Sequence, residues 1–283
     1  MLTLDSQQIP NDLKQLSHPV SKLHVQAEDF DSLLQSPRLA IIGSRKVSPY
    51  GRGVTQTLTA ELASKGIVIV SGLALGTDSI AHQACLDVGG QTIAVLPCGL
   101  DKIYPSSHTN LARNIVKNGG AIVTEYDFDT TPFPSNFLER NRIVAALSEG
   151  VLVTEAAIRS GSLNTANHAL QLGKPVFAVP GNITNPLSAG CNNLIKAGAI
   201  PVTCVEDILT ALKWRDLNIS QRDIKGGTDE EQVIIDLLKS GVSDGAELLI
   251  ESDLDASRFN QALTMLEITG SIRPTGANHW TLA

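Results

Sequence analysis

Short apolar runs alternate with longer, more polar stretches from Leu39 to Leu212. The runs are LAIIG, IVIVSG, QTIAVLP, AIVTEY, VLVTEA and PVFAVP, with a weaker IPVTC near the end. Each run is almost continuously apolar, as expected for strands buried on both faces of a parallel sheet. The stretches between them carry helix signals, such as Ser48-Pro49 at a start and Gly66 at an end. The alternation predicts an α/β fold with a doubly wound, mostly parallel sheet over residues 39–212.

The two ends of the chain have different patterns. Residues 1–38 are broken by three prolines and predict a short N-terminal lead-in rather than a domain. Residues 213–228 lack apolar periodicity and contain a Gly-Gly pair, which predicts a linker. In residues 229–283, the stretches EEQVIIDLLKSG, AELLIESD and ASRFNQALTMLEITG predict three helices, and SIRPTGANHWTLA predicts two short strands around a turn. Three helices followed by a hairpin predict a small winged-helix-like domain.

Charge is distributed unevenly along the chain, whose net charge is −7. Residues 1–225 contain 19 Lys and Arg against 19 Asp and Glu. Residues 226–283 contain three basic residues against ten acidic ones and therefore carry the whole net charge. An anion-binding site is consequently expected in the first part of the chain and not in the last.

Composition excludes several classes of protein. No apolar run approaches the roughly 18 residues of a membrane-spanning helix, and the N-terminus lacks the basic and apolar regions of a secretory signal. The four cysteines, Cys85, Cys98, Cys191 and Cys204, form no C-x-x-C pair and predict buried, reduced thiols in a cytoplasmic protein. The six histidines are scattered and no two share a helix face at ligand spacing, so no metal site is expected. No cofactor is expected either.

Five loops that follow the predicted strands are rich in small and hydroxyl-bearing residues. They are GSRK (43–46), SGLALGTD (71–78), CGLDKIYP (98–105), EAAIRSGSLNTA (155–166) and PGNITNPLSAGCN (180–192). In a doubly wound sheet these loops share the edge where ligands bind. Glycine allows close approach of an anion, hydroxyls and helix N-terminal amides donate to it, and arginine adds charge. The expected phosphate-contacting residues in these loops are Gly43, Ser44, Arg45, Lys46, Gly72, Arg159, Gly161, Ser162 and Thr165. The alternative is that the loops are tight turns and helix caps only.

The segment FLERNR adds a second group of candidates. Arg140 and Arg142 flank Asn141 at the start of an apolar helix, so one arginine can face the ligand edge while the other pairs with an acid. The alternative is a solvated helix start with an arginine paired to Glu139 or Glu149. Phe137 is either a core residue or a stacking platform for a base.

Catalytic chemistry is weakly represented. Glu155 is the best single candidate for a general base, but no nucleophile lies at a telling spacing from it. The sequence therefore predicts a binding protein and not an enzyme.

Taken together, these motifs resemble the DNA-processing protein A family, also called Smf. The stretches IIGSRKVSPYG, VSGLALGTDSIAHQACL, TIAVLPCGLDKIYP, FLERNRIVAALS, VLVTEAAIRSGSLNTANHAL, GKPVFAVPGNI and NNLIKAGA carry the resemblance across roughly residues 38–212. It implies an extended Rossmann-like domain that binds single-stranded DNA without cutting it, helps to load the recombinase RecA during natural transformation, and works as a homodimer.

The resemblance also assigns residues. Ser44 and Arg45 match phosphate ligands. Three more, Phe137, Arg140 and Asn141, match a segment that borders the DNA-binding pocket, and the loop that completes the pocket is matched by Arg159, Gly161 and Ser162. The sequence departs from the family at Leu138, where proline is common, and in its short N-terminal region. It departs also in the acidic C-terminal segment, for which a protein-contact or regulatory role is favoured.

Two other functions remain open. The same Rossmann variant resembles lysine-decarboxylase-like phosphoribohydrolases, although Glu155 here precedes the small-residue loop instead of following it. A sensor of a free nucleotide-derived ligand is the third hypothesis.

Overall fold

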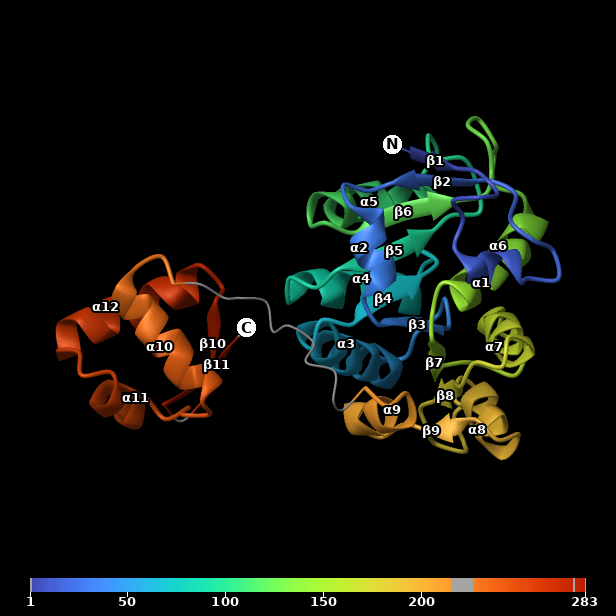
Figure 1. The fold of residues 1–283 in the computed structure, drawn as a ribbon. Coiled ribbons are helices and arrows are strands. Elements are labelled where there is room, and N and C mark those ends of the chain that lie inside the picture. Colours follow the sequence, from blue (N-terminus) through green and yellow to red (C-terminus); the bar gives the residue numbers. More distant parts are fainter. Residues whose placement is uncertain (1, 215–225, 277, 283) are drawn as a thin grey trace. The chain divides into compact units, whose positions relative to one another are not determined.

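The computed structural model describes residues 2–214, 226–276 and 278–282. Two compact units divide the chain, residues 1–219 and residues 220–283 (Figure 1). Each unit contains apolar core clusters made only of its own residues. The first unit has the α/β fold that the sequence predicts, and the second is a small unit of helices and a hairpin.

A nine-stranded sheet forms the centre of the first unit, in the order β1-β2-β6-β5-β4-β3-β7-β8-β9. Its strands are β1 (Leu2–Leu4), β2 (Leu23–Gln26), β3 (Arg38–Gly43), β4 (Val68–Ser71), β5 (Thr92–Val95), β6 (Ala121–Thr124), β7 (Gly150–Glu155), β8 (Val176–Ala178) and β9 (Ile200–Pro201). From β6 to β9 all neighbours are parallel, and only β1 and β2 run antiparallel to their neighbours. Every apolar run that the sequence shows after Leu39 is a strand of this sheet.

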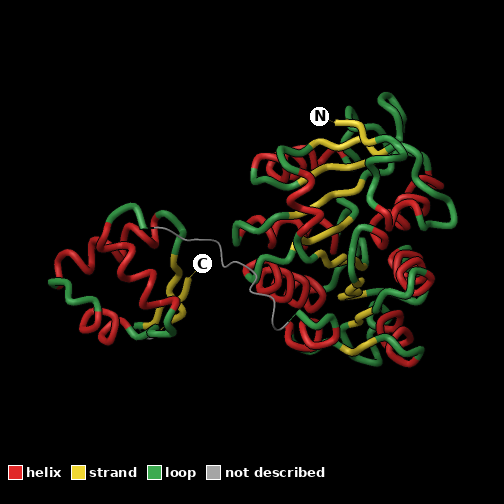
Figure 2. The backbone as a smooth tube through the Cα atoms, in the orientation of Figure 1, coloured by secondary structure: helices red, strands yellow, loops and turns green. Residues whose placement is uncertain are grey.

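Helices cover both faces of the sheet (Figures 1 and 2). They are α1 (Asn11–Lys14), α2 (Phe30–Gln35), α3 (Pro49–Ser64), α4 (Thr77–Asp87), α5 (Thr109–Lys117), α6 (Pro134–Ala146), α7 (Ser162–Gln171), α8 (Ala189–Lys196) and α9 (Val205–Ala211). Alternate residues of one strand point to opposite faces: Ala40 and Ile42 pack in the core with α6 and α7, while Leu39 and Ile41 pack in the core with α3 and α9. Burial on both sides explains why these strands show no polar alternation.

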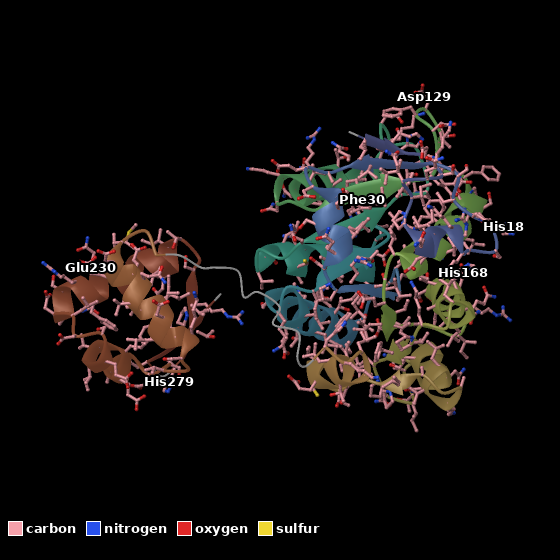
Figure 3. All side chains as sticks on the ribbon, in the orientation of Figure 1. His18, Phe30, Asp129, His168, Glu230 and His279 are labelled. Atoms are coloured by element: carbon pink, nitrogen blue, oxygen red, sulfur yellow. The ribbon has the colours of Figure 1, made fainter. Side chains whose placement is uncertain are left out.

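Residues 1–38 are not a separate lead-in, which corrects the sequence-based expectation. Strand β2 pairs with β6, β1 pairs with β2, and Leu13, Leu23 and Leu33 are completely buried in the main core. Figure 3 shows Phe30 of α2, which is 6% exposed, and His18 on the loop between α1 and β2. Residues 1–38 thus add two antiparallel strands to the edge of the sheet. Antiparallel neighbours do not need the crossover helix that joins parallel strands.

The second unit consists of α10 (Asp229–Lys239), α11 (Gly245–Glu251), α12 (Ala256–Ile268) and the hairpin of β10 (Ile272–Gly276) with β11 (His279–Leu282). Side-chain caps begin each helix: Thr228, Asp244 and Asp255 accept hydrogen bonds from first-turn amides. The three helices and the hairpin agree with the sequence-based expectation, and their assignment as a winged helix stays a prediction. Residues 215–225 of the linker expected at 213–228 lie outside the described residues; Trp214, inside the expected linker, is instead buried in the core of the first unit.

Cys85, Cys98 and Cys191 are buried, but Cys204 is exposed, which corrects the expectation of four buried cysteines. Cys204 is the N-cap of α9, a position at the surface end of a helix. None of the described helices combines the length and apolar character needed to cross a membrane.

Candidate functional site

The order of the strands reverses between β3 and β7. The chain moves outward from β3 through β4 and β5 to β6, returns along α6 to β7 beside β3, and then continues to β8 and β9. Loops after β3 and β7 therefore diverge at a topological switch point, the place where open α/β sheets bind ligands. A groove of about 440 Å³ lies there.

All twelve residues that the sequence singles out line this groove. They are Gly43, Ser44, Arg45, Lys46, Gly72, Phe137, Arg140, Asn141, Arg159, Gly161, Ser162 and Thr165. The charged lining residues are Arg45, Lys46, Arg140 and Arg159 against Asp78 alone. The structure thus brings the candidates from four separate segments together in an electropositive site.

The turn after β3 is held by its own backbone and hydroxyl group. The Ser44 amide donates to the Glu155 carbonyl oxygen over 2.7 Å, and the Thr77 amide donates to the Ser44 carbonyl oxygen over 3.1 Å. The Ser44 hydroxyl donates to the Lys46 carbonyl oxygen and accepts from the Lys46 amide, at 2.8 and 3.0 Å. Ser44 is 8% exposed and therefore shapes the turn that presents the next two residues.

Arg45 and Lys46 are exposed, and neither forms an ion pair with any residue that the structure describes. The Arg45 guanidinium lies over the Phe137 ring, 5.2 Å from its centroid. The Phe137 ring also meets the Tyr104 ring in an edge-to-face contact, with the centroids 5.2 Å apart. Stacking on the ring restrains Arg45 while leaving its N–H groups available to an anion.

Arg140 has a different environment from Arg45. It is 3% exposed, and its Nη1 donates to the carbonyl oxygens of Gly72 and Val95 at the ends of β4 and β5. Burial lowers the pKa of Arg140 to about 10, and the nearby carboxylate of Asp78 opposes this shift. Arg140 contributes charge to the groove floor, and its hydrogen bonds serve to organise the loops.

Asp78 completes this buried arrangement. Its Oδ2 accepts from the amides of Gly72 and Ala74, at 3.1 and 3.4 Å. Burial raises the pKa of Asp78, against the effect of Arg140. Helix α4 begins after Gly76, so Asp78 lies in the first helical turn and folds back onto the loop instead of capping the helix.

Arg142, the second arginine of the segment, pairs with Glu125 and lies 3.4 Å from Glu139. The expectation that one arginine faces the ligand edge and the other pairs with an acid agrees with this arrangement. Glu139 was an expected partner; Glu125, which follows β6, was not expected. Asn141 Nδ2 donates to Asn164 Oδ1 over 3.2 Å and thereby ties α6 to α7.

Helix α7 begins at the opposite wall of the groove. Its N-cap, Gly161, is exposed and provides no side-chain cap, while Ser162 and Thr165 are buried at 8% and 2% exposure. The Ser160 and Ser162 hydroxyls hydrogen-bond to each other at 2.7 Å. Arg159 is exposed on the loop before this helix start. An open helix N-terminus beside an exposed arginine suits an anionic ligand.

Glu155 does not face the groove, which contradicts its candidacy as a general base. Its side chain is 1% exposed, and its carboxylate accepts from the Ser48 amide over 2.8 Å and from the Ser48 hydroxyl. The carboxylate anchors the start of α3. Among the described residues, no group of three or more His, Cys, Asp or Glu side chains is arranged to hold a metal ion.

Two aromatic residues at this sheet edge are not among the site residues that the sequence predicts. Tyr104 contacts Phe137, and Tyr50 in the first turn of α3 is half exposed beside the loop after β8. The signal in the sequence is that Tyr50 follows the small-residue loop GSRK. That signal does not reveal the site, because the residues that Tyr50 contacts lie far away in the sequence. Asp101, on the same loop as Tyr104, accepts from the Asp129 amide over 2.9 Å and holds that loop.

Comparison with known proteins gives consistent matches. The model of the family DNA recombination-mediator protein A matches residues 1–213. The chain is 50% identical to protein Smf of Escherichia coli K12 over 181 residues, which are 64% of this chain and 48% of that protein. It is 42% identical to DNA processing protein DprA of Streptococcus pneumoniae R6, over 64% of each chain.

Solved structures give the same result for the fold. The X-ray structure of DprA from S. pneumoniae has a TM-score of 0.69 at 38% identity and covers 74% of this chain and 73% of that one. A structure of DNA processing protein A from Helicobacter pylori, which describes its single-stranded DNA binding mode, has a TM-score of 0.68 at 38% identity and covers 75% of this chain and 95% of that one. The matched region spans about half to two thirds of the length of the E. coli and S. pneumoniae proteins.

Proposed function

The chain belongs to the DNA recombination-mediator protein A family, and from this premise we propose that its groove binds the backbone of single-stranded DNA. The observation that carries the proposal is the exposed Arg45 guanidinium, stacked on Phe137 at the mouth of a groove with four cationic residues and one acidic residue. Phosphate groups are bound by such bidentate donors, and aromatic rings stack with bases. The H. pylori relative described above binds single-stranded DNA.

The role of the bound DNA extends this proposal. The chain acts without cutting DNA, as a cytoplasmic homodimer that protects incoming strands and delivers them to RecA in transformation and recombination. The engagement of Glu155 with Ser48 supports binding over hydrolysis, because the best candidate base is occupied and buried.

Replacing Arg45 tests the proposal. Arg45→Ala is expected to weaken binding of a labelled oligo(dT) by about tenfold or more, and the slope of log affinity against log salt should decrease by about 0.7 for one lost phosphate contact. Fluorescence anisotropy at several salt concentrations measures both quantities.

Arg113→Ala provides the matched control. Arg113 is an exposed arginine of α5 that does not line the groove. Arg113→Ala therefore changes the net charge of the chain by the same amount as Arg45→Ala. Equal affinities for the Arg45 variant and the unsubstituted chain, or equal losses in both variants, would contradict the proposal. Binding of mononucleotides without any affinity for oligonucleotides would favour the nucleotide sensor.

A further inference from the structure

A second cavity, of about 630 Å³, lies at the same edge of the sheet. It is lined by Tyr50, Pro180, Gly181, Asn182, Asn185 and Ser188. One wall is the first turn of α3, four residues after Lys46 of the groove. The other wall is the loop after β8, in which Leu187 lines the groove while Asn185 and Ser188 line the cavity. The loop after β8 therefore lines both the groove and the cavity, and the first turn of α3 follows the groove's turn along the chain.

The walls of this cavity are fixed by hydrogen bonds. The Tyr50 hydroxyl donates to the Pro180 carbonyl oxygen over 2.8 Å. The Asn192 side chain accepts from the Gly181 amide over 3.2 Å and donates to the Gly181 carbonyl oxygen over 3.1 Å. A side chain at position 181 would meet the Ser188 Cβ at 2.6 Å, so the close approach requires glycine. The cavity is preformed, which reduces the entropy cost of binding.

The loop after β8 also orients the polar side chains of the cavity, Asn182 and Asn185. Asn182 Oδ1 accepts from the Thr184 amide and hydroxyl, at 3.0 and 2.9 Å, and Asn185 Oδ1 accepts from the Leu187 amide at 3.0 Å. Within the described part of the chain, the amide N–H₂ groups of Asn182 and Asn185 have no acceptor. The cavity thus combines a half-exposed aromatic ring with side-chain amide donors that make no hydrogen bond to another described residue.

The lining residues carry no charge, in contrast to the groove. A phosphate group would find no cation here. A neutral, flat group with hydrogen-bond acceptors on its edge matches both the tyrosine ring and the asparagine amides. A nucleobase has these properties.

We infer that the cavity beside Tyr50 is a base-binding subsite for the strand whose backbone lies in the groove. The inference rests on the proposed function. Strands β3 and β8 both neighbour β7, so their ends lie two strand spacings, about 10 Å, apart. A strand held by Arg45 reaches the cavity within a few nucleotides, and its bases then meet Phe137 and Tyr104 at one end of the site and Tyr50 at the other.

Two substitutions of Tyr50 in the full chain test the subsite. Tyr50→Leu removes the ring and keeps apolar bulk, and it is expected to weaken binding of oligo(dT) by about 5- to 150-fold, the range for one base–aromatic stack. Tyr50→Phe keeps the ring and loses only the hydrogen bond to Pro180, so it is expected to lose much less affinity than Tyr50→Leu. Photocrosslinking of oligo(dT) that contains one 5-iodouracil should label Tyr50 in the unsubstituted chain.

The outcomes separate the subsite from the groove. If Tyr50→Leu binds like the unsubstituted chain and no crosslink forms at Tyr50, while Arg45→Ala loses affinity, the subsite is overturned and the groove stands. If thymidine monophosphate displaces oligo(dT) at concentrations similar to those of the oligonucleotide itself, the cavity is a mononucleotide site and the inference fails. If the unsubstituted chain binds no oligonucleotide, the proposed function itself is contradicted.

Discussion

At the scale of single residues, burial decides what each arginine of the groove does. Arg45 and Arg140 are the same chemical group, but Arg45 is exposed without an ion pair to any described residue, whereas Arg140 is 3% exposed and donates to two carbonyl oxygens. Moving a guanidinium away from buried carbonyl oxygens costs free energy, because those oxygens then lack a hydrogen-bond donor. Arg45 is therefore the residue that we propose for ligand contact, and Arg140 the residue that orders the loops.

Gly72→Ala tests the organising role of Arg140. A Cβ atom at position 72 would lie 2.5 Å from the Arg140 Cζ, so the buried guanidinium would have to move. We expect a loss of about 1–3 kcal/mol in the free energy of unfolding, measured by urea denaturation, together with weaker oligo(dT) binding.

Gly53→Ala is the matched control for this substitution. Gly53 is exposed within α3 with nothing within 4 Å of the added Cβ, so alanine should stabilise the helix by up to about 1 kcal/mol. A Gly72 variant as stable as the unsubstituted chain would show that Arg140 is not held as described.

His82 makes the stability of the first unit dependent on pH. It is fully buried and hydrogen-bonds through Nδ1 to Thr92 Oγ1 at 2.7 Å. Burial, with smaller effects of His108 and Arg140, lowers the pKa of His82 from 6.5 to about 3. Between these values the unfolded chain binds a proton that the folded chain does not, so stability falls as pH decreases below 6.5.

His82 is expected to lower the free energy of unfolding by about 1.4 kcal/mol for each pH unit between pH 6 and 4, as measured by urea unfolding. His82→Gln should reduce that slope. His18→Gln, at an exposed position on the loop before β2, should leave it unchanged (Figure 3). The same slope in all three proteins would rule out His82 as its source.

At the scale of elements, the start of α3 depends on a residue from another strand. The Ser48 hydroxyl accepts from the Gly51 amide over 3.1 Å, and Ser48 donates to the carboxylate of Glu155 at the end of β7. The same glycine is required because a Cβ at position 51 would meet Glu155 Oε2 at 2.6 Å. The helix cap and the neighbouring strand therefore form one unit beneath the groove.

Ser48→Ala removes this connection. It should cost about 1–3 kcal/mol of stability in thermal or urea unfolding, because the helix loses its cap and the buried carboxylate loses a donor. Ser64→Ala near the end of the same helix should have little effect or be slightly stabilising, since Ser64 is exposed and its hydroxyl binds only the Ala60 carbonyl oxygen. Equal effects at both positions would contradict the special role of Ser48.

At the scale of the whole molecule, the two units differ in charge and have separate cores. The apolar cluster of the second unit contains only residues from 234 to 282, and residues 226–283 carry a net charge of −7. Such a segment repels a polyanion, so it is a poor candidate for holding the DNA backbone.

Residues 1–214 and 226–283, produced separately, should each unfold cooperatively in calorimetry, because each contains its own buried core. The 1–214 chain should bind oligo(dT) at low salt at least as tightly as the full chain. A large loss of affinity on removal of residues 226–283 would show that the acidic unit contributes contacts.

Sequence patterns alone determined the sheet and the place of the groove. Continuous apolar runs such as VLVTE predict strands buried on both faces, and parallel strands joined by helices bring their following loops to one edge. For this reason the sequence could predict that twelve residues from four segments lie together at one site. Strands β1 and β2 escaped prediction because they are short, at three and four residues, and pair antiparallel without a crossover.

Only the tertiary structure decided the roles of the individual side chains. The sequence cannot state that Arg140 is buried against Gly72 and Val95, that Glu155 turns from the groove toward Ser48, or that Tyr50 reaches Pro180. Each of these contacts joins residues far apart in the chain. Burial and hydrogen-bond partners depend on how distant segments pack, whereas the local pattern reports only which segments form strands and helices.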